Sequence, residues 1–102
     1  MTEVELVDAF FEKINNEDFE TFYKFFTKET VIYLIDEKRE LPVSELVDRL
    51  ETKEYKFKFL RRFSSSAAVK QETLTKEKQV DFIFDIRQRR IYRLELTTNL
   101  TF

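Results

Sequence analysis

The sequence contains no cysteine, no histidine and no glycine, and it has a single proline. Without cysteine the chain can form neither disulfides nor thiolate nucleophiles, and a reducing cytoplasm is the expected compartment. Without histidine it lacks the commonest general base and the commonest zinc ligand, so we expect no metal site and no cofactor. Without glycine it has neither a phosphate-cradling loop nor the Gly-x-Ser-x-Gly turn of serine hydrolases.

Long apolar runs and a basic N-terminal segment are also missing. No apolar run approaches the roughly 20 residues that cross a bilayer, and residues 1–5 are acidic. We therefore expect neither a membrane partner nor a secretory signal peptide. Phenylalanine is abundant, with twelve in 102 residues, and 42 % of the residues are hydrophobic. This length and composition predict one folded domain, residues 1–102.

Charge is unevenly distributed along the chain. Residues 1–52 hold 14 acidic and 6 basic side chains, whereas residues 53–102 hold 6 acidic and 12 basic ones. Such asymmetry can indicate a nucleic-acid partner, or it can mean that acidic helices pack on a more basic sheet. Because the whole chain carries a net charge of −2 and repels phosphate at long range, we expect no nucleic-acid partner.

Three helices are predicted in the first half of the chain. Thr2 caps the first as part of a capping box, and apolar residues recur at helical spacing over residues 4–14. Asn16 is expected to cap a second, phenylalanine-rich helix. The only proline, Pro42, is placed to start the third helix, for which Ser44 is an alternative cap.

Strand patterns account for most of the remaining sequence. Residues 26–36 predict the first strand, followed by a polar loop at residues 37–40. Further strands are predicted at residues 55–59, 69–75, 79–86 and 91–98, with a turn or bulge at 64–68 and a turn at 75–78. The order indicates an α+β domain in which three N-terminal helices pack on an antiparallel sheet.

The register of the last hairpin follows from the rule that facing residues share one side of a sheet. The pairs that satisfy it are Ile86–Tyr92, Phe84–Leu94 and the oppositely charged Asp85–Arg93. The connecting turn is then residues 88–90. One of these residues must be left-handed without being glycine, at a cost of roughly 1 kcal/mol.

Three segments carry a resemblance to a known superfamily: "FFEKINNEDFETFYKFFTKETVIYLID", "LPVSELVDRL" and "RQRRIYRLEL". Their order resembles the NTF2-like superfamily, also called SnoaL-like or cystatin-like, over essentially the whole chain. The resemblance implies a curved, cone-shaped sheet whose concave side is closed by the helices, with a pocket between them. It also implies an Asp-Gly hairpin turn, where this chain has Gln88-Arg89.

The same superfamily contains isomerases, dehydratases, transport factors and dimerisation modules, so the fold alone does not define the activity. Its isomerases resemble one another in a first-helix tyrosine that stabilises an oxyanion and a first-strand aspartate that moves a proton. The resemblance places Phe10 and Leu34 at these two positions. Neither side chain can perform the chemistry, and no catalytic residue is predicted.

The candidate pocket residues are Phe10, Tyr33, Leu34, Asp36, Phe59, Arg61 and Tyr92. Asp36 could reach the pocket mouth or could be a solvated carboxylate at the strand end. Strict alternation turns Arg61 inward, where it would need an acidic partner or an anionic ligand, whereas a β-bulge near Leu60 would return it to solvent.

Two functions remain open. The first is a non-catalytic binding or protein-interaction module, for a partner or for a small hydrophobic or carboxylate-bearing ligand. The alternative is an isomerase, dehydratase or hydrolase that uses Asp36 with Tyr33 or Arg61. In either case we expect a homodimer formed through the outer face of the sheet, with Ile83, Asp85, Ile91 and Arg93 as the candidate contact residues.

Overall fold

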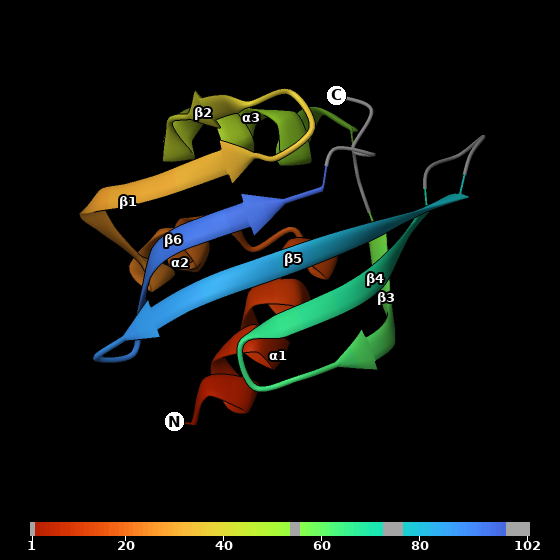
Figure 1. Cartoon of the computed structure of the whole chain (residues 1–102), viewed down its shortest axis with the longest axis horizontal. Helices are drawn as coiled ribbons and strands as arrows, with labels where there is room; N and C mark the ends of the chain where they lie inside the picture. Colours follow the sequence, from red (N-terminus) through yellow and green to blue (C-terminus); the bar gives the residue numbers. More distant parts are fainter. Residues whose placement is uncertain (1, 54–55, 73–76, 98–102) are drawn as a thin grey trace.

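The computed structural model of the chain describes residues 2–53, 56–72 and 77–97. Its helices are α1 (Glu3–Asn15), α2 (Phe19–Phe22), a single 3₁₀ turn η1 (Tyr23–Phe25) and α3 (Val43–Lys53). Its strands are β1 (Phe26–Leu34), β2 (Arg39–Leu41), β3 (Lys56–Arg62), β4 (Ser66–Glu72), β5 (Glu77–Arg87) and β6 (Arg90–Leu96). The α+β architecture predicted from the sequence is confirmed, and Figure 1 shows the helices behind one curved, unclosed sheet.

The six strands follow the order β2-β1-β6-β5-β4-β3. All neighbouring pairs are antiparallel except β1 and β6, which run parallel. The predicted sheet was purely antiparallel and therefore differs from the observed one at this pair. The prediction of a polar loop at 37–40 is also partly wrong. Residues 39 and 40 belong to β2, which pairs with β1.

The capping residues explain where the first two helices begin. The backbone N–H of Glu5 donates to Oγ1 of Thr2 at 3.2 Å, as the capping box predicts. Asn16, predicted to cap the second helix, instead ends α1. Asp18 caps α2, and its Oδ1 accepts a hydrogen bond from the backbone N–H of Thr21 at 3.4 Å.

The third helix begins where the only proline predicts. The carbonyl of Pro42 accepts hydrogen bonds from the backbone N–H groups of Glu45, at 3.1 Å, and Leu46, at 3.2 Å. Ser44, the alternative cap, lies inside α3. Proline suits this boundary because the first N–H groups of a helix have no partner within it.

The register of the β5–β6 hairpin is confirmed in its central part. The predicted pairs Phe84–Leu94 and Asp85–Arg93 are present. The register then shifts, so that Ile86 lies opposite Ile91 rather than opposite Tyr92. Tyr92 is the extra residue of a β-bulge in β6, and every side chain between it and the turn therefore changes face.

The turn between β5 and β6 is one residue shorter than predicted. Arg87 pairs with Arg90, which leaves Gln88 and Arg89 as the two turn residues. Both have positive φ, 49° and 64° respectively, as a type I′ turn requires. Two non-glycine residues therefore take the left-handed conformation, where one was expected.

Two other predicted turns are only partly present. The turn at 64–68 is confined to residues 64–65, and Ser66 already begins β4. The turn at 75–78 lies half outside the described residues, and its second half belongs to β5. Residue 55, the first of the strand predicted at 55–59, also lies outside the described part of the chain.

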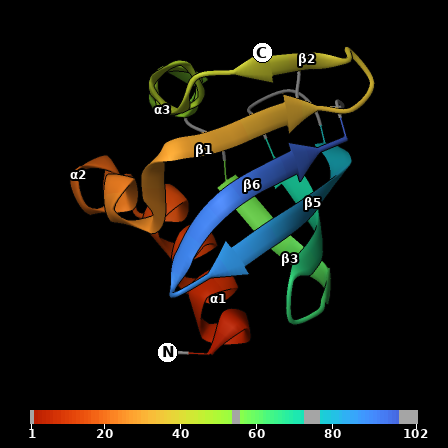
Figure 2. The same ribbon diagram turned by 60° about the vertical axis from the view of Figure 1, so that its left-hand side comes forward.

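One apolar cluster fills the space between the helices and the sheet. Figure 2 shows the sheet curving around α1. The helix contributes Leu6, Val7, Phe10, Phe11 and Ile14 to the cluster, as its 3.6-residue spacing predicts. The strand residues in the cluster are Phe26, Ile32, Leu34, Leu41, Phe57, Ala67, Val69, Val80, Phe82, Phe84, Ile91, Leu94 and Leu96, and α2 and α3 add Phe19, Phe22, Leu46, Val47 and Leu50. No helix in the described residues is long and apolar enough to cross a membrane.

Candidate functional site

The concave side of the sheet is occupied by phenylalanine rings. Phe10 is fully buried, and its ring centroid lies 5.0 Å from that of Phe22 and 5.2 Å from that of Phe84. Phe11 meets Phe82 edge to face at 4.9 Å. Such tilted and edge-to-face contacts are the geometries that aromatic rings prefer in tightly packed cores. The rings of these residues bring no polar group to the concave side of the sheet.

The two positions at which the sequence resemblance implies catalytic residues are apolar and buried. Phe10 is 0 % exposed and Leu34 is 1 % exposed. Leu34 lies on β1 opposite Leu96 of β6, within the apolar cluster. A phenylalanine offers no hydroxyl to an oxyanion and a leucine offers no exchangeable proton. Proton transfer of the isomerase type has no donor or acceptor at these two residues.

The three polar groups of the enzymatic alternative do not converge. Tyr33 lies on the outer face of β1, since its neighbours Ile32 and Leu34 are buried on the inner face. Asp36 is exposed in the turn that follows β1. Arg61 is exposed on β3, which three strands separate from β1. Asp36 and Arg61 are therefore too far apart to act together on one small substrate, and Tyr33 lies on the outer face of the sheet rather than on its concave side.

Arg61 reaches solvent because β3 contains a bulge. Phe59 pairs with Val69 and Arg61 pairs with Ala68, so Leu60 is the extra residue between them. This is the alternative to an inward arginine that the sequence left open. The extra residue breaks the strict alternation on which an inward Arg61 depended.

The other two predicted pocket residues lie at the margin of the core or outside it. Phe59 is 41 % exposed, although its ring meets that of Phe11 at 5.2 Å. The guanidinium of Arg62 lies 5.3 Å above the Phe59 ring. Tyr92, in the β6 bulge, is half-buried, and its ring lies 5.6 Å from the guanidinium of Arg87. Of the predicted pocket residues, only Phe10 and Leu34 lie deep in the core.

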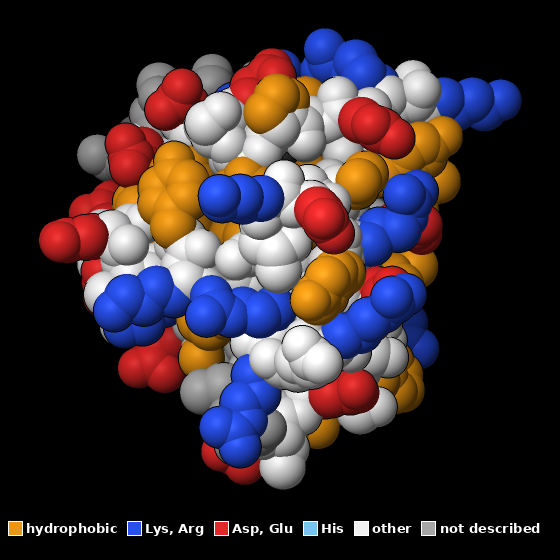
Figure 3. Space-filling view, turned by 90° about the vertical axis from the view of Figure 1, so that its left-hand side faces the viewer, with side chains coloured by type: hydrophobic (Ala, Val, Ile, Leu, Met, Phe, Trp, Pro, Cys, Tyr) orange, Lys and Arg blue, Asp and Glu red, His pale blue; other side chains and the backbone are white. Residues whose placement is uncertain are grey.

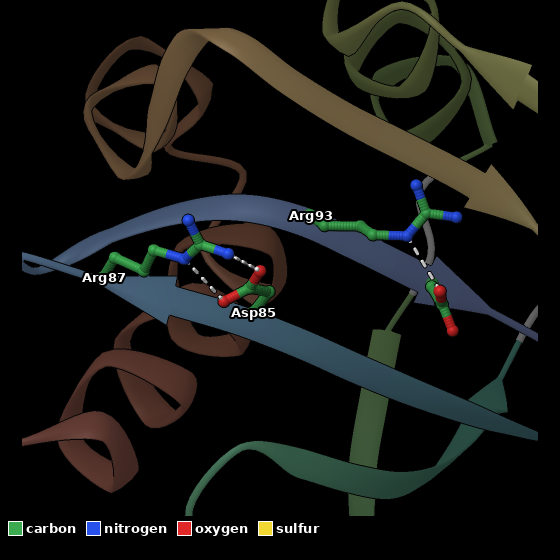
Figure 4. A network of polar contacts seen from close by, with 4 residues as sticks. Asp85, Arg87 and Arg93 are labelled. Atoms are coloured by element: carbon green, nitrogen blue, oxygen red, sulfur yellow. Dashed lines mark hydrogen bonds and ion pairs between the residues drawn. The ribbon is translucent and has the colours of Figure 1, made fainter.

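The outer face of the sheet carries a network of charged and aromatic side chains. Arg87 forms a bidentate ion pair with Asp85, with N–O distances of 3.2 and 3.0 Å. Figure 4 shows this pair beside Arg93, whose Nε donates to Glu95 at 2.8 Å. The guanidinium of Arg93 also lies 5.1 Å from the centroid of the Tyr33 ring. Asp85 and Arg93 face one another in register as predicted, but each forms its ion pair along its own strand.

Among the predicted dimer contacts, Ile91 was placed on the wrong face. It is fully buried in the core, because the bulge at Tyr92 reverses the alternation of β6 before the turn. Ile83 is 45 % exposed on the outer face, and Asp85 and Arg93 are half-buried beside it. The helices lie on the other side of the sheet, so Ile83 is not covered by any helix that the structure describes.

Positive charge is interrupted rather than continuous near the β5–β6 turn. Figure 3 views this end of the molecule and shows lysine and arginine side chains interleaved with acidic and apolar ones. Arg90 adds a hydrogen bond to the carbonyl of Lys24, which ties the turn to η1. Six arginines lie in the sheet half, and three of them, Arg62, Arg87 and Arg93, form ion pairs with carboxylates.

Open depressions also occur on the part of the surface that the structure describes. One, of about 390 Å³, is lined by Glu17, Phe19, Glu20 and Glu51. Near it, hydrogen bonds from Thr21 and Lys13 hold the pKa of the Asp18 carboxyl below its usual value. Another, of about 360 Å³, is lined by Thr30, Val31, Glu40, Leu41 and Pro42. No group of three or more metal-binding side chains occurs among the residues that the structure describes.

Asn15 is a surface feature that the sequence did not reveal. Its side-chain amide donates to the carbonyl of Phe57 at 2.9 Å and accepts from the Phe57 N–H at 2.8 Å. The two residues are 42 positions apart, so no local pattern could predict the contact. Leu60 and Phe63, which are 51 % and 58 % exposed, were likewise not selected from the sequence.

Solved structures with this fold cover nearly the whole chain. An NTF2-like protein of unknown function from Cytophaga hutchinsonii has a TM-score of 0.80 and 16 % identity, covering 94 % of this chain and 88 % of that one. A candidate ketosteroid isomerase from Kribbella flavida has a TM-score of 0.79 and 12 % identity, covering 93 % of this chain and 76 % of that one. The epoxide hydrolase/cyclase-like enzyme SalBIII, which acts in pyran ring formation in the polyether salinomycin, has a TM-score of 0.77 and 17 % identity. The match covers 97 % of this chain and 92 % of that one.

The chain therefore has the NTF2-like fold, as the sequence resemblance implies. No protein-family model matches the sequence, and no curated protein matches it. Identities of this size establish the fold alone, because this fold supports enzymes and non-enzymes alike.

Proposed function

We propose that the domain is a non-catalytic protein-interaction module that pairs with a second copy of itself through the outer face of its sheet. The observation that carries the proposal is the identity of the residues at the catalytic positions. Phe10 and Leu34 are buried among other apolar side chains, and the polar candidates Tyr33, Asp36 and Arg61 are dispersed. The solved relatives with enzyme names share the fold with this chain at 17 % identity or less, which does not carry their activity over.

The composition of the outer face favours a homodimer. Ile83 is a large exposed apolar side chain with charges of both signs around it, including Asp85, Arg93 and Glu95. A two-fold axis through such a surface can place the cations of one copy against the carboxylates of the other and bury both isoleucines. The phenylalanine packing on the concave side favours a protein partner over a small hydrophobic or carboxylate-bearing ligand.

The mass of the protein in solution tests the dimer. We expect sedimentation equilibrium to give about twice the chain mass of 12.5 kDa for the wild type and a monomer for Ile83→Lys, because the substitution replaces apolar contact area at the centre of the interface with a charge that must be desolvated. Tyr23→Lys is the matched control, since Tyr23 is 46 % exposed on η1, away from the sheet face. A monomeric wild type, or a dimeric Ile83→Lys variant, would contradict the proposed pairing.

Catalysis is tested separately with a β,γ-unsaturated 3-ketosteroid and absorbance of the conjugated enone product. We expect no isomerisation above the rate in buffer, for the wild type and for Asp36→Asn alike. Isomerisation that Asp36→Asn abolishes would overturn the non-catalytic part of the proposal and support the enzymatic alternative.

A further inference from the structure

Strand β3 combines exposed apolar side chains with a position at the edge of the sheet, where no other described strand pairs with its outer side. It is the last strand in the sheet order, as Figure 1 shows. Five large hydrophobic side chains are exposed among the residues that the structure describes, and three of them, Phe59, Leu60 and Phe63, lie in or directly after this strand. Because edge strands with exposed apolar residues invite pairing by another chain, this concentration indicates a binding surface.

The backbone of β3 already accepts a strand-like partner at one residue. Asn15 both donates to and accepts from the backbone of Phe57, which is the pair of bonds that a residue of a neighbouring antiparallel strand would make. These bonds show that the polar groups of Phe57 point away from β4. By the two-residue period of a strand, those of Phe59 point the same way, beyond the reach of Asn15.

The charges of β3 define the chemistry of the partner. Residues 56–62 contain Lys56, Lys58, Arg61 and Arg62 and no acidic residue. Pairing with the β3 of a second copy would place four cations against four others, which is unfavourable. A segment with carboxylates complements the same edge. Arg62 already forms an ion pair with Asp8 of α1, so β3 has an acidic neighbour on its helix side.

We propose that β3 receives an extended, acidic segment of a different protein as an added strand that begins beside Phe59. Backbone hydrogen bonds from the edge hold the segment. Its apolar side chains contact Phe59, Leu60 and Phe63, and a carboxylate of the segment faces Arg61. The bulge at Leu60 interrupts the ladder, which keeps the paired stretch short and leaves selectivity to these side chains. This inference rests on the domain being an interaction module, but it uses a surface distinct from the sheet-face dimer.

A selection from a random twelve-residue peptide library displayed on phage, with the full chain as bait, tests the proposal. We expect enriched peptides that are acidic and contain alternating apolar residues. Their binding, measured by fluorescence anisotropy, should weaken at least tenfold in Leu60→Lys and in Phe63→Lys, and should remain unchanged in Tyr23→Lys. Both substituted residues are more than half exposed, so the folded state should persist, which circular dichroism checks. N-methylation of alternate amides along one edge of the peptide should abolish binding, because it removes the pairing donors.

Three results would overturn the proposal. One is a selection without enrichment, or with enriched peptides that are basic. Another is peptide binding that persists in both Leu60→Lys and Phe63→Lys. The third is conversion of a wild-type dimer into monomers by Leu60→Lys, because β3 would then be a contact between copies. Failure of the sheet-face dimer is distinguishable, since Ile83→Lys should change the mass in solution and leave peptide binding intact.

Discussion

At the scale of single residues, Phe10 decides how the concave side of the sheet is used. A tyrosine there would bring the hydroxyl that an isomerase of this fold needs, but the ring is enclosed by Phe11, Phe22 and Phe84. A buried hydroxyl without a hydrogen-bond partner costs about 1–3 kcal/mol. We therefore expect Phe10→Tyr to lower the free energy of unfolding by about that amount, measured by urea denaturation.

The control for this substitution is Phe25→Tyr. Phe25 packs against the same ring, with centroids 6.3 Å apart, but it is only half-buried, so its hydroxyl can reach water. We therefore expect Phe25→Tyr to change the free energy of unfolding little. If Phe10→Tyr is as stable as the wild type, the hydroxyl has found water or a polar group, and a hydrated pocket on the concave side becomes the better description.

At the scale of elements, α1 and β3 are joined by the Asn15 side chain. Removing it leaves the N–H and the carbonyl of Phe57 without these partners at a half-buried site. We expect Asn15→Ala to cost about 1–3 kcal/mol and to accelerate hydrogen exchange at the Phe57 amide. The adjacent, exposed Asn16→Ala is the comparison. An unchanged hydrogen-exchange rate at the Phe57 amide in Asn15→Ala would mean that groups other than the Asn15 side chain protect this amide.

The β5–β6 turn offers a second test at this scale. Gln88 and Arg89 both have positive φ, which glycine and asparagine adopt more easily than other residues. We expect Gln88→Asn combined with Arg89→Gly to raise the free energy of unfolding by about 1 kcal/mol. This net value allows for the entropy that glycine adds to the unfolded chain, which opposes the gain. Arg89→Ala removes the same charge without relieving the backbone and should give no gain. A destabilised double variant would argue against the two-residue turn.

The elements also show how far local pattern determines this structure. The helical spacing and caps predicted α1 and α3 well, because those signals lie within a few neighbouring residues. The bulges at Leu60 and Tyr92 were not fixed by pattern, because a bulge depends on the partner strand. β2 was missed because its three residues form a strand only through pairing with β1. That Phe10 and Leu34 offer no hydroxyl or carboxylate could be read from the sequence, whereas the surface formed by Asn15 and β3 required the fold.

At the scale of the whole molecule, the helices and the sheet share one apolar cluster. The Phe82 ring packs against rings from two elements, Phe10 and Phe11 on α1 and Phe57 on β3, and stacks on its strand neighbour Phe84. We expect Phe82→Ala to cost about 3–5 kcal/mol. Because these elements share the ring, circular dichroism and hydrogen exchange in α1 and in β3 should report one common transition.

An exposed aromatic residue provides the comparison for that experiment. Phe63→Ala removes a side chain of the same size that is 58 % exposed, and it should cost much less than Phe82→Ala. Separate transitions for α1 and β3 would contradict a single cooperative core.

The parallel pairing of β1 with β6 has a consequence for synthesis of the protein on the ribosome. β6 lies between β1 and β5 in the sheet but follows all the other strands in the sequence. Until β6 has emerged, β1 and the β3–β4–β5 unit have no strand to join them, and the phenylalanine-rich N-terminal segments lack most of the surface that buries them. Until β6 has left the ribosome, the nascent chain therefore exposes these phenylalanine-rich segments, so its yield in cells should depend on chaperones that hold unfolded chains more than its final stability suggests.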